Sequence, residues 1–269
     1  MPSVALGPVD LFYETAGSGE PVIFIPGFAT NLHLWDHQVE PVSRHFRCVR
    51  FDLRGQGRSS APAEGYATAD FAKDLQDLME HLNLARSHLV AASMGGAIAV
   101  HLALEHPELV RSLTLAGAVV DGFTDWPDDF TARLRHARKL AKTEGVDSAL
   151  TDWKTHPFFL RTRDAGGFFK SVLQYSGAGW LTAVRAPSAP TTDFARLVEI
   201  EKPTLVVVGD SDVDPCQELA KELAARVRNA RRVVIPSAGH LPCWDQPGAF
   251  NRALLEFLEG NATARLNSG

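Results

Sequence analysis

Short apolar runs rich in β-branched residues alternate along the chain with longer segments whose apolar residues recur every three or four positions. The first pattern is typical of buried strands, and the second is typical of helices that bury one face. Their alternation predicts an α/β fold, in which a mostly parallel sheet is flanked by helices on both faces. Strands are expected at residues 22–25, 48–52, 88–92, 112–117, 204–209 and 232–236, and helices at residues 70–84, 215–227 and 247–260.

One long segment, residues 121–185, interrupts this alternation. It has no strand pattern, and it contains 10 of the chain's 23 aromatic residues. Such an insertion predicts a small helical lid over one end of the sheet. The lid would follow the strand at residues 112–117, which is the sixth strand when the two strands of an N-terminal hairpin are counted before the parallel part. We therefore expect a core of residues 1–120 and 186–269 with a helical cap of residues 121–185. Its rings either line a pocket or only pack the lid onto the core, and they include Trp126, Trp153, Phe158, Phe159, Phe168, Phe169 and Trp180.

The composition narrows the classes of partner. The 269 residues carry a formal net charge of −5, and the lysines and arginines are scattered along the chain. This distribution argues against nucleic acid and against a membrane surface as partners, and it favours a small neutral or apolar molecule. No motif supplies a site for a metal or an organic cofactor. The oligomeric state stays open.

Cysteine usage and the N-terminal pattern predict a cytoplasmic protein. Cys48, Cys216 and Cys243 form no Cys-x-x-Cys pair and no metal-ligand spacing, so we expect neither a disulfide nor a metal cluster. Residues 1–17 alternate apolar and polar side chains, which is unlike a signal peptide. No apolar run approaches the ~20 residues that span a bilayer.

A serine stands at an abrupt change of pattern in LVAASMGGAIAV, residues 89–100. Ser93 follows an expected strand and precedes an expected helix, and its neighbours Ala91, Gly95 and Gly96 are small. A sharp turn from strand to helix needs such neighbours, because larger side chains would collide there. The turn would expose the hydroxyl at the carboxyl end of a strand, where open α/β sheets gather their reactive groups. Since serine alone is a weak nucleophile, it needs a base and a group that orients the base.

Candidates for the base and the orienting acid follow two later strands. His240 comes directly after the last expected strand, whereas the other nine histidines lie mainly in helical stretches or at helix ends. Asp210, Asp212 and Asp214 come after the preceding strand. His240 could instead cap the next helix, and at least two of the aspartates are expected to have such a capping role. From these residues alone, the choice of acid stays open.

Five motifs in chain order resemble those of the α/β-hydrolase superfamily. They are IPGFATNLHLWDHQ, FDLRGQGRSS, ASMGG, GDSDVDP and AGHLPCWDQP. In that superfamily they correspond to the oxyanion loop, a D-x-x-G-x-G-x-S turn, the nucleophile elbow, the acid and the histidine. The resemblance extends along nearly the whole chain and is weakest in the lid. It is greatest to small carboxylesterases, haloperoxidase-like hydrolases and enol-lactonases.

The resemblance implies a catalytic triad. Ser93 would be the nucleophile, and His240 would be the general base and acid. The superfamily's acid sits in a G-x-x-D pattern, which places it at Asp212. The substitutes that remain open are Asp210, Asp214 and the more distant Asp121.

The resemblance also implies an oxyanion hole made by the backbone amides of Phe28 and Met94. Two positions depart from the usual pattern. Ala91 replaces the first glycine of the elbow, which suggests a slightly relaxed turn. Pro26 precedes Gly27 where many relatives have histidine, so a histidine that could hold this loop is absent.

Further residues in these motifs have structural roles as their simplest explanation. Asp52, Arg54 and Ser59 are expected to stabilise the D-x-x-G-x-G-x-S turn without taking part in chemistry. Cys243 either lines the pocket or is a buried, inert thiol.

The function implied is a serine hydrolase that cleaves a carboxylic ester or lactone with a small to medium apolar group. It would work through an acyl-enzyme, without metal or cofactor. Three alternatives stay open, since fold and function are only loosely coupled. They are a carbon–carbon bond hydrolase of vinylogous diketones, a cofactor-free perhydrolase or oxygenase, and a hydrolase-like ligand receptor.

Overall fold

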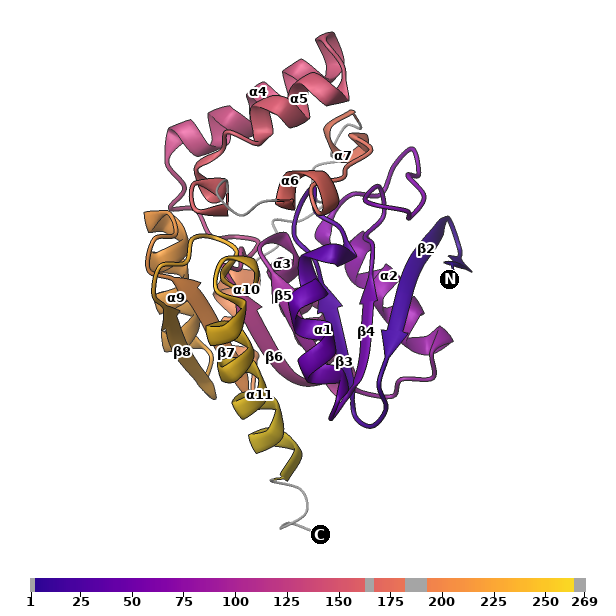
Figure 1. Cartoon of the computed structure of the whole chain (residues 1–269), viewed down its shortest axis with the longest axis vertical. Coiled ribbons are helices and arrows are strands. Elements are labelled where there is room, and N and C mark those ends of the chain that lie inside the picture. Colours follow the sequence, from indigo (N-terminus) through magenta and orange to yellow (C-terminus); the bar gives the residue numbers. More distant parts are fainter. Residues whose placement is uncertain (1–2, 163–166, 182–192, 264–269) are drawn as a thin grey trace.

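One eight-stranded sheet forms the centre of the computed structural model, which describes residues 3–162, 167–181 and 193–263 (Figure 1). The strand order is β1-β2-β4-β3-β5-β6-β7-β8. The β1–β2 and β2–β4 pairs are antiparallel, and all other neighbours are parallel. The strands are β1 (Ser3–Leu6), β2 (Val9–Ala16), β3 (Pro21–Ile25), β4 (Arg47–Phe51), β5 (Ser87–Ala92), β6 (Val110–Ala116), β7 (Thr204–Gly209) and β8 (Ala230–Ile235).

Helices cover both faces of this sheet, as the alternating pattern predicts. On one face lie α2 (Thr68–His81), α3 (Met94–Glu105) and α9 (Asp214–Arg226), and on the other α1 (Asp36–Ser43) and α11 (Pro247–Thr263). Two short helices, α8 (Asp193–Arg196) and α10 (Pro242–Asp245), complete the core. All six expected strands and all three expected helices are present, with ends that differ by up to three residues. These predictions are confirmed.

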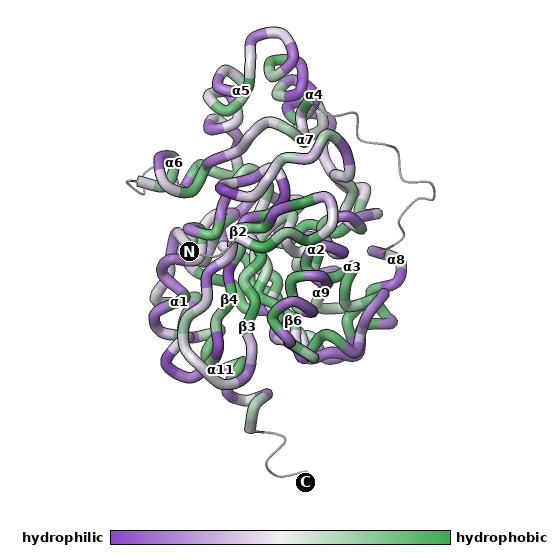
Figure 2. Tube along the Cα trace, turned by 90° about the vertical axis from the view of Figure 1, so that its right-hand side faces the viewer, coloured by the Kyte–Doolittle hydropathy of each residue, from purple (hydrophilic) through white to green (hydrophobic). Residues whose placement is uncertain are grey.

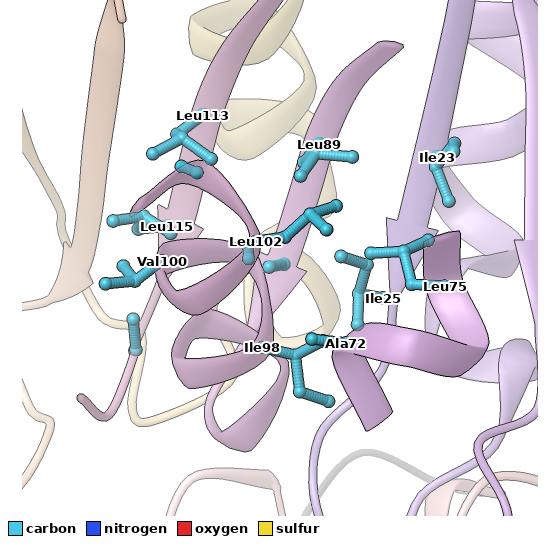
Figure 3. Close-up of a cluster of buried hydrophobic side chains, with 14 of the residues drawn as sticks. Ile23, Ile25, Ala72, Leu75, Leu89, Ile98, Val100, Leu102, Leu113 and Leu115 are labelled. Atoms are coloured by element: carbon cyan, nitrogen blue, oxygen red, sulfur yellow. The ribbon is translucent and has the colours of Figure 1, made fainter. Parts of the chain in front are cut away.

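Alternate residues of the strands divide the core into two layers. Ile23 and Ile25 of β3 pack with α2 and α3, whereas Val22 and Phe24 pack with α1 and α11. Figure 3 shows the first layer, where side chains of β3, β5 and β6 meet those of α2 and α3. The trace of β3 is largely green in Figure 2, which marks hydrophobic residues. Buried on both faces, these strands have continuous apolar runs, which explains why the sequence locates them so well.

The segment after β6 forms a helical lid over the carboxyl ends of the parallel strands (Figure 1). Its first helices, α4 (Asp128–Thr143) and α5 (Val146–Trp153), pack against each other, and α7 (Ala178–Leu181) packs against α4. The short helix α6 (Phe168–Ser171) lies between α5 and α7 in sequence. The helical insertion after the sixth strand is therefore confirmed, while its predicted boundary at residue 185 lies outside the described residues.

A buried ion pair ties the loop after β4 to α2. Both side chains are almost fully buried, with 5% of Arg54 and 3% of Asp74 exposed. The guanidinium donates from Nη2 to Oδ1 and from Nε to Oδ2 of Asp74, each at 2.6 Å. Such a two-bond geometry compensates the cost of removing two charges from water, and losing one partner leaves the other charge uncompensated.

We expect Asp74→Ala to lower the free energy of unfolding by roughly 3–5 kcal/mol, because it leaves the Arg54 guanidinium buried without its carboxylate. Urea unfolding followed by circular dichroism measures this loss. Asp77→Ala on the same helix is the matched control, since its partner Lys73 is largely exposed. The control is expected to cost less than about 1 kcal/mol. Equal losses in the two variants would contradict the importance assigned to the buried pair.

Candidate active site

The serine corner is a strained turn between β5 and α3. Ser93 has φ 51° and ψ −120°, a backbone conformation that residues other than glycine rarely adopt. Three backbone hydrogen bonds hold it: its N–H donates to Ala116, and its carbonyl oxygen accepts from Gly96 and Val119. The turn presents the Ser93 side chain at the carboxyl edge of the sheet, next to the N-terminus of α3. This geometry is the sharp strand-to-helix turn that the small neighbours predict.

His240 and Asp212 reach the same place from two other loops. Asp212 follows β7, and His240 follows β8. Space is so tight that a Cβ atom on Gly117, after β6, would lie 2.2 Å from the carbonyl oxygen of His240. Gly117 also has φ +50°, so glycine suits both its conformation and its surroundings.

The three side chains form one chain of hydrogen bonds. Nε2 of His240 lies 2.9 Å from Oγ of Ser93, and Nδ1 lies 3.2 Å from each carboxylate oxygen of Asp212. With its proton on Nδ1, the imidazole donates to the carboxylate and accepts the serine proton at Nε2. Exposure is 9% for Ser93, 2% for His240 and 5% for Asp212. The structure thus brings together the three residues that the resemblance selects.

The substitute acids lie in other positions. Asp210 is exposed, and hydrogen bonds from the Ser211 hydroxyl and from backbone amides lower the pKa of its carboxyl. Asp214 is the exposed first residue of α9, and Asp121 lines the large cavity beside the site. Among the described residues, only Asp212 makes a carboxylate hydrogen bond to His240.

Phe28 and Met94 both lie beside Ser93. Met94 is the first residue of α3, so its N–H has no acceptor within the helix. No hydrogen bond of the Phe28 amide is found within the described chain. A hollow of about 30 Å³ is lined by Phe28, Ser93 and His240 together with Gly27, Thr30, Trp153, Phe158, Phe159 and Leu241. It offers space for a small group next to the serine hydroxyl.

Gln56 holds the loop that carries Phe28. Its Nε2 donates to the carbonyl oxygen of Gly27 at 3.1 Å, and its Oε1 accepts from the amide of Ala29. The side chain therefore brackets Phe28 on both sides. Thr30 adds a second hydrogen bond to Gly27, from its hydroxyl at 2.9 Å. These contacts fix a loop in which the usual histidine is replaced by Pro26.

The remainder of the D-x-x-G-x-G-x-S turn is structural, as expected. The Asp52 carboxylate accepts from the amides of Leu32 and Arg58 at 2.7 and 2.8 Å. The Ser59 hydroxyl donates to the Asp52 carbonyl oxygen at 2.6 Å and accepts from the amide of Phe12. The loop after β4 is thereby fastened to both β2 and the loop that leads into α1.

Lid aromatics form the walls of a cavity of about 420 Å³ that opens at Ser93. Trp126, Trp153, Phe158 and Trp180 line it, together with Phe123, Phe130 and Tyr175. Phe159 lines the smaller hollow. Phe168 and Phe169 instead pack against each other and Phe159, and Phe168 also packs against Trp244. Most of the lid rings therefore line a pocket, whereas Phe168 and Phe169 pack the lid onto the core.

Phe158 joins the lid to the reacting side chains. Its ring lies parallel to the imidazole of His240, with centroids 3.7 Å apart and planes 7° from parallel. His156 lies beside it, and burial lowers the pKa of His156 to about 3, with the charge of His240 adding to the effect. The imidazole of His156 is therefore neutral near pH 7.

Cys216 completes the surroundings of His240. Its Sγ lies 3.6 Å from Nδ1 of His240, and burial raises the pKa of the thiol well above its usual value. In the described part of the chain, Asp212, Cys216 and His240 are the one group with metal-ligand spacing, and the same atoms bond one another. Burial also raises the pKa of the Cys243 thiol, and all three cysteines are unpaired. Cys243 is fully buried and lines neither cavity, so of the two interpretations the buried thiol applies.

Three side chains of the site, Gln56, Phe158 and Arg138, could not be placed there from the sequence. Gln56 sits between the two glycines of a recognised motif, which was the only available signal. Phe158 was singled out as a lid ring, but nothing in the sequence places it on His240. Arg138 lies on the predicted lid without any motif around it.

Comparisons with known proteins agree with this geometry. A family model described as the α/β-hydrolase fold matches residues 20–247. A Synechocystis protein named as a non-heme chloroperoxidase is 30% identical, over 96% of this chain and 100% of its own. The enol-lactonase of Burkholderia xenovorans is 25% identical with a TM-score of 0.81, over 96% of this chain and 100% of its own. A thermophilic esterase from Thermogutta terrifontis is 26% identical with a TM-score of 0.78, over 97% of this chain and 99% of its own.

These likenesses cover the core and the lid alike. None of the helices in the described ranges combines the length and the apolar character needed to cross a membrane. The matched segment contains the serine corner, the aspartate loop and the histidine loop. The chain therefore belongs to the α/β-hydrolase family and is an enzyme of the hydrolase class.

Proposed function

We propose that this protein is a serine hydrolase that cleaves a carboxylic ester or lactone carrying a small to medium apolar group. The observation that carries the proposal is the hydrogen-bonded chain from Ser93 through His240 to Asp212, at one end of an apolar cavity. Relatives named as an esterase and an enol-lactonase support the same substrate class. A cavity of about 420 Å³ has the size of a small-molecule site.

In the first half of the reaction, Oγ of Ser93 attacks the carbonyl carbon while Nε2 of His240 takes the hydroxyl proton. The Asp212 carboxylate accepts the Nδ1–H bond and stabilises the imidazolium that forms. The amides of Phe28 and Met94 donate to the oxyanion, with the N-terminus of α3 adding a favourable dipole. His240 then protonates the leaving alcohol, and the acyl group stays on Ser93.

In the second half, water replaces the alcohol. His240 takes a proton from the water, whose oxygen attacks the acyl carbon through a second oxyanion in the same hollow. The Ser93–acyl bond breaks, and the serine oxygen recovers its proton from the imidazolium. The carboxylic acid leaves and the starting state returns. A lactone follows the same steps, except that its alcohol and acid stay in one molecule.

A second candidate function is perhydrolysis by the same residues. The relative named as a non-heme chloroperoxidase supports it. Hydrogen peroxide would replace water in the second half of the reaction, giving a peracid and free Ser93. The two functions share the acyl-enzyme and differ in the acceptor, so peroxide added to an ester assay separates them.

Ser93→Ala is expected to lower kcat for p-nitrophenyl esters, acetate through decanoate, by at least about 10⁴-fold, because it removes the attacking oxygen. Release of p-nitrophenolate without added metal measures this change, and the optimum chain length reports the depth of the cavity. Equal activity in both proteins would refute Ser93 as nucleophile. Inactivity of the wild type on the whole panel would instead favour carbon–carbon bond cleavage, peroxide chemistry or ligand sensing.

Asp212→Asn is expected to lower kcat by about 10⁴-fold, because the amide favours the wrong imidazole tautomer. Asp214→Asn is the matched control, since this exposed carboxylate lies two residues away and makes no contact with His240 among the described residues. Its kcat should stay within about twofold of the wild type if Asp212 is the acid. The reverse result would move the role of the acid to Asp214.

Gln56→Ala is expected to lower kcat by roughly 10- to 100-fold with little change in KM, because the loop that presents the Phe28 amide loses its bracket. Gln56→Glu keeps the acceptor for Ala29 and loses the donor to Gly27, so an intermediate loss is expected. Steady-state kinetics on the best ester of the panel measures both variants. A rise in KM at constant kcat would show that Gln56 binds substrate instead of positioning the loop.

A further inference from the structure

The cavity beside Ser93 holds a cation that no group in the described part of the chain neutralises. Two arginines line its wall, Arg54 and Arg138. Arg54 is fully occupied by Asp74 and by the carbonyl oxygens of Gly65 and Asp70. Arg138, on the lid helix α4, makes no hydrogen bond and no ion pair in the described part of the chain, although its Nε is buried.

Two further donors in the same wall have no acceptor among the described residues. They are the buried indole Nε1 atoms of Trp153 on α5 and Trp180 on α7. Both side chains are more than nine-tenths buried, and both line the cavity with Arg138. Since α4 packs against α5 and α7, the three donors come from one helical cluster. Buried donors are usually paired in proteins, so these three groups are available to an acceptor on a bound ligand.

The other polar groups of the wall do not supply that acceptor. Asp121 lines the cavity, and no ion pair joins it to Arg138 among the described residues. The Tyr66 hydroxyl donates to the carbonyl oxygen of Pro62, and the amide of Gln56 is used by Gly27 and Ala29. The remainder of the wall is largely aromatic and aliphatic.

The charge of the lid helix favours the same class of ligand. Although the whole chain carries a net charge of −5, helix α4 contains five lysine and arginine residues against two aspartates. The two aspartates stand in its first turn, away from Arg138. Arg138 thus belongs to a mostly basic helix, although the neighbouring helix α5 carries Asp147 and Asp152.

We propose that the lid contains a carboxylate-binding subsite, in which Arg138 pairs with an anionic end of the ester or lactone substrate. The planar guanidinium fits two carboxylate oxygens, and the indole donors of Trp153 and Trp180 add to the same wall. The substrate is thus an ester or lactone with a reactive carbonyl at Ser93 and a carboxylate on an apolar spacer. This inference rests on the proposed hydrolase function and narrows its substrate class.

The test compares paired substrates of nearly equal shape. One member is the mono-p-nitrophenyl ester of adipate, pimelate or suberate. The other is the p-nitrophenyl ester in which a methyl group replaces the free carboxylate, such as hexanoate for adipate. The ratio of kcat/KM within each pair isolates the effect of charge, and the spacer length with the largest ratio reports the separation between Ser93 and Arg138.

We expect the wild type to prefer the anionic member by at least about tenfold, and Arg138→Gln to reduce this ratio by about 10- to 100-fold. Arg138→Lys should give an intermediate ratio, because it keeps the charge and loses the planar fork. Lys139→Gln is the control, since it removes one positive charge from the exposed side of the same helix. A ratio near one in the wild type, or equal ratios in Arg138→Gln and Lys139→Gln, would overturn the subsite.

A binding measurement separates this proposal from the proposed hydrolysis. Calorimetry with the Ser93→Ala protein compares monomethyl adipate with methyl hexanoate, and no turnover is needed. Tighter binding of the anion that falls at least about tenfold with Arg138→Gln supports the subsite even when no ester is cleaved. Ser93-dependent cleavage of both ester types without charge preference would leave the hydrolase standing and reject the subsite.

Discussion

The site depends on how closely the first turn of α3 approaches β3. A Cβ atom on Gly95 would lie 2.6 Å from the carbonyl oxygen of Ile25, and one on Gly96 would lie 2.4 Å from Cβ of Ala118. This close packing and the three backbone hydrogen bonds of Ser93 together keep it in its strained conformation, which costs about 1–3 kcal/mol by itself. Burial of α3 residues such as Ile98 and Val100 offsets that cost, at roughly 25 cal/mol per Å² of apolar surface. The core therefore stabilises the conformation that the chemistry requires.

Parallel strand order converts distant sequence positions into neighbours. Ser93 and His240 are 147 positions apart, yet β5, β6, β7 and β8 lie side by side and end at one edge. The loops after β5, β7 and β8 each contribute one member of the hydrogen-bonded chain. The loop after β6 contributes Gly117, which has no side chain and so allows the backbone of His240 to lie against it. One sheet edge thus brings together the candidate catalytic groups without a long connecting loop.

The sequence alone predicts those elements whose structure depends on residues close together in the chain. Buried strands and the elbow at Ser93 follow from apolar runs and small neighbours, so both are predictable. The choice among Asp210, Asp212 and Asp214 needed the family resemblance, because only the folded loop shows which carboxylate faces His240. The contacts of Gln56 depend on β3 and β4 being neighbours, and those of Phe158 depend on how the lid folds back. Arg138 on α4 has the pattern of an ordinary solvated arginine, and only the folded cavity gives it another role.

The division between core and lid separates reactivity from selectivity. Within the described chain, the hydrogen bonds of Ser93, Asp212 and His240 all go to core residues, and the lid reaches the imidazole through the ring of Phe158. Most of the cavity wall instead comes from the segment after β6. Substitutions in that wall can therefore alter which acyl or alcohol group fits while the proton-transfer geometry is preserved. Arg138 lies in that largely apolar wall, where a charge interacts more strongly than in bulk water, so the proposed subsite assigns the choice of substrate to the lid.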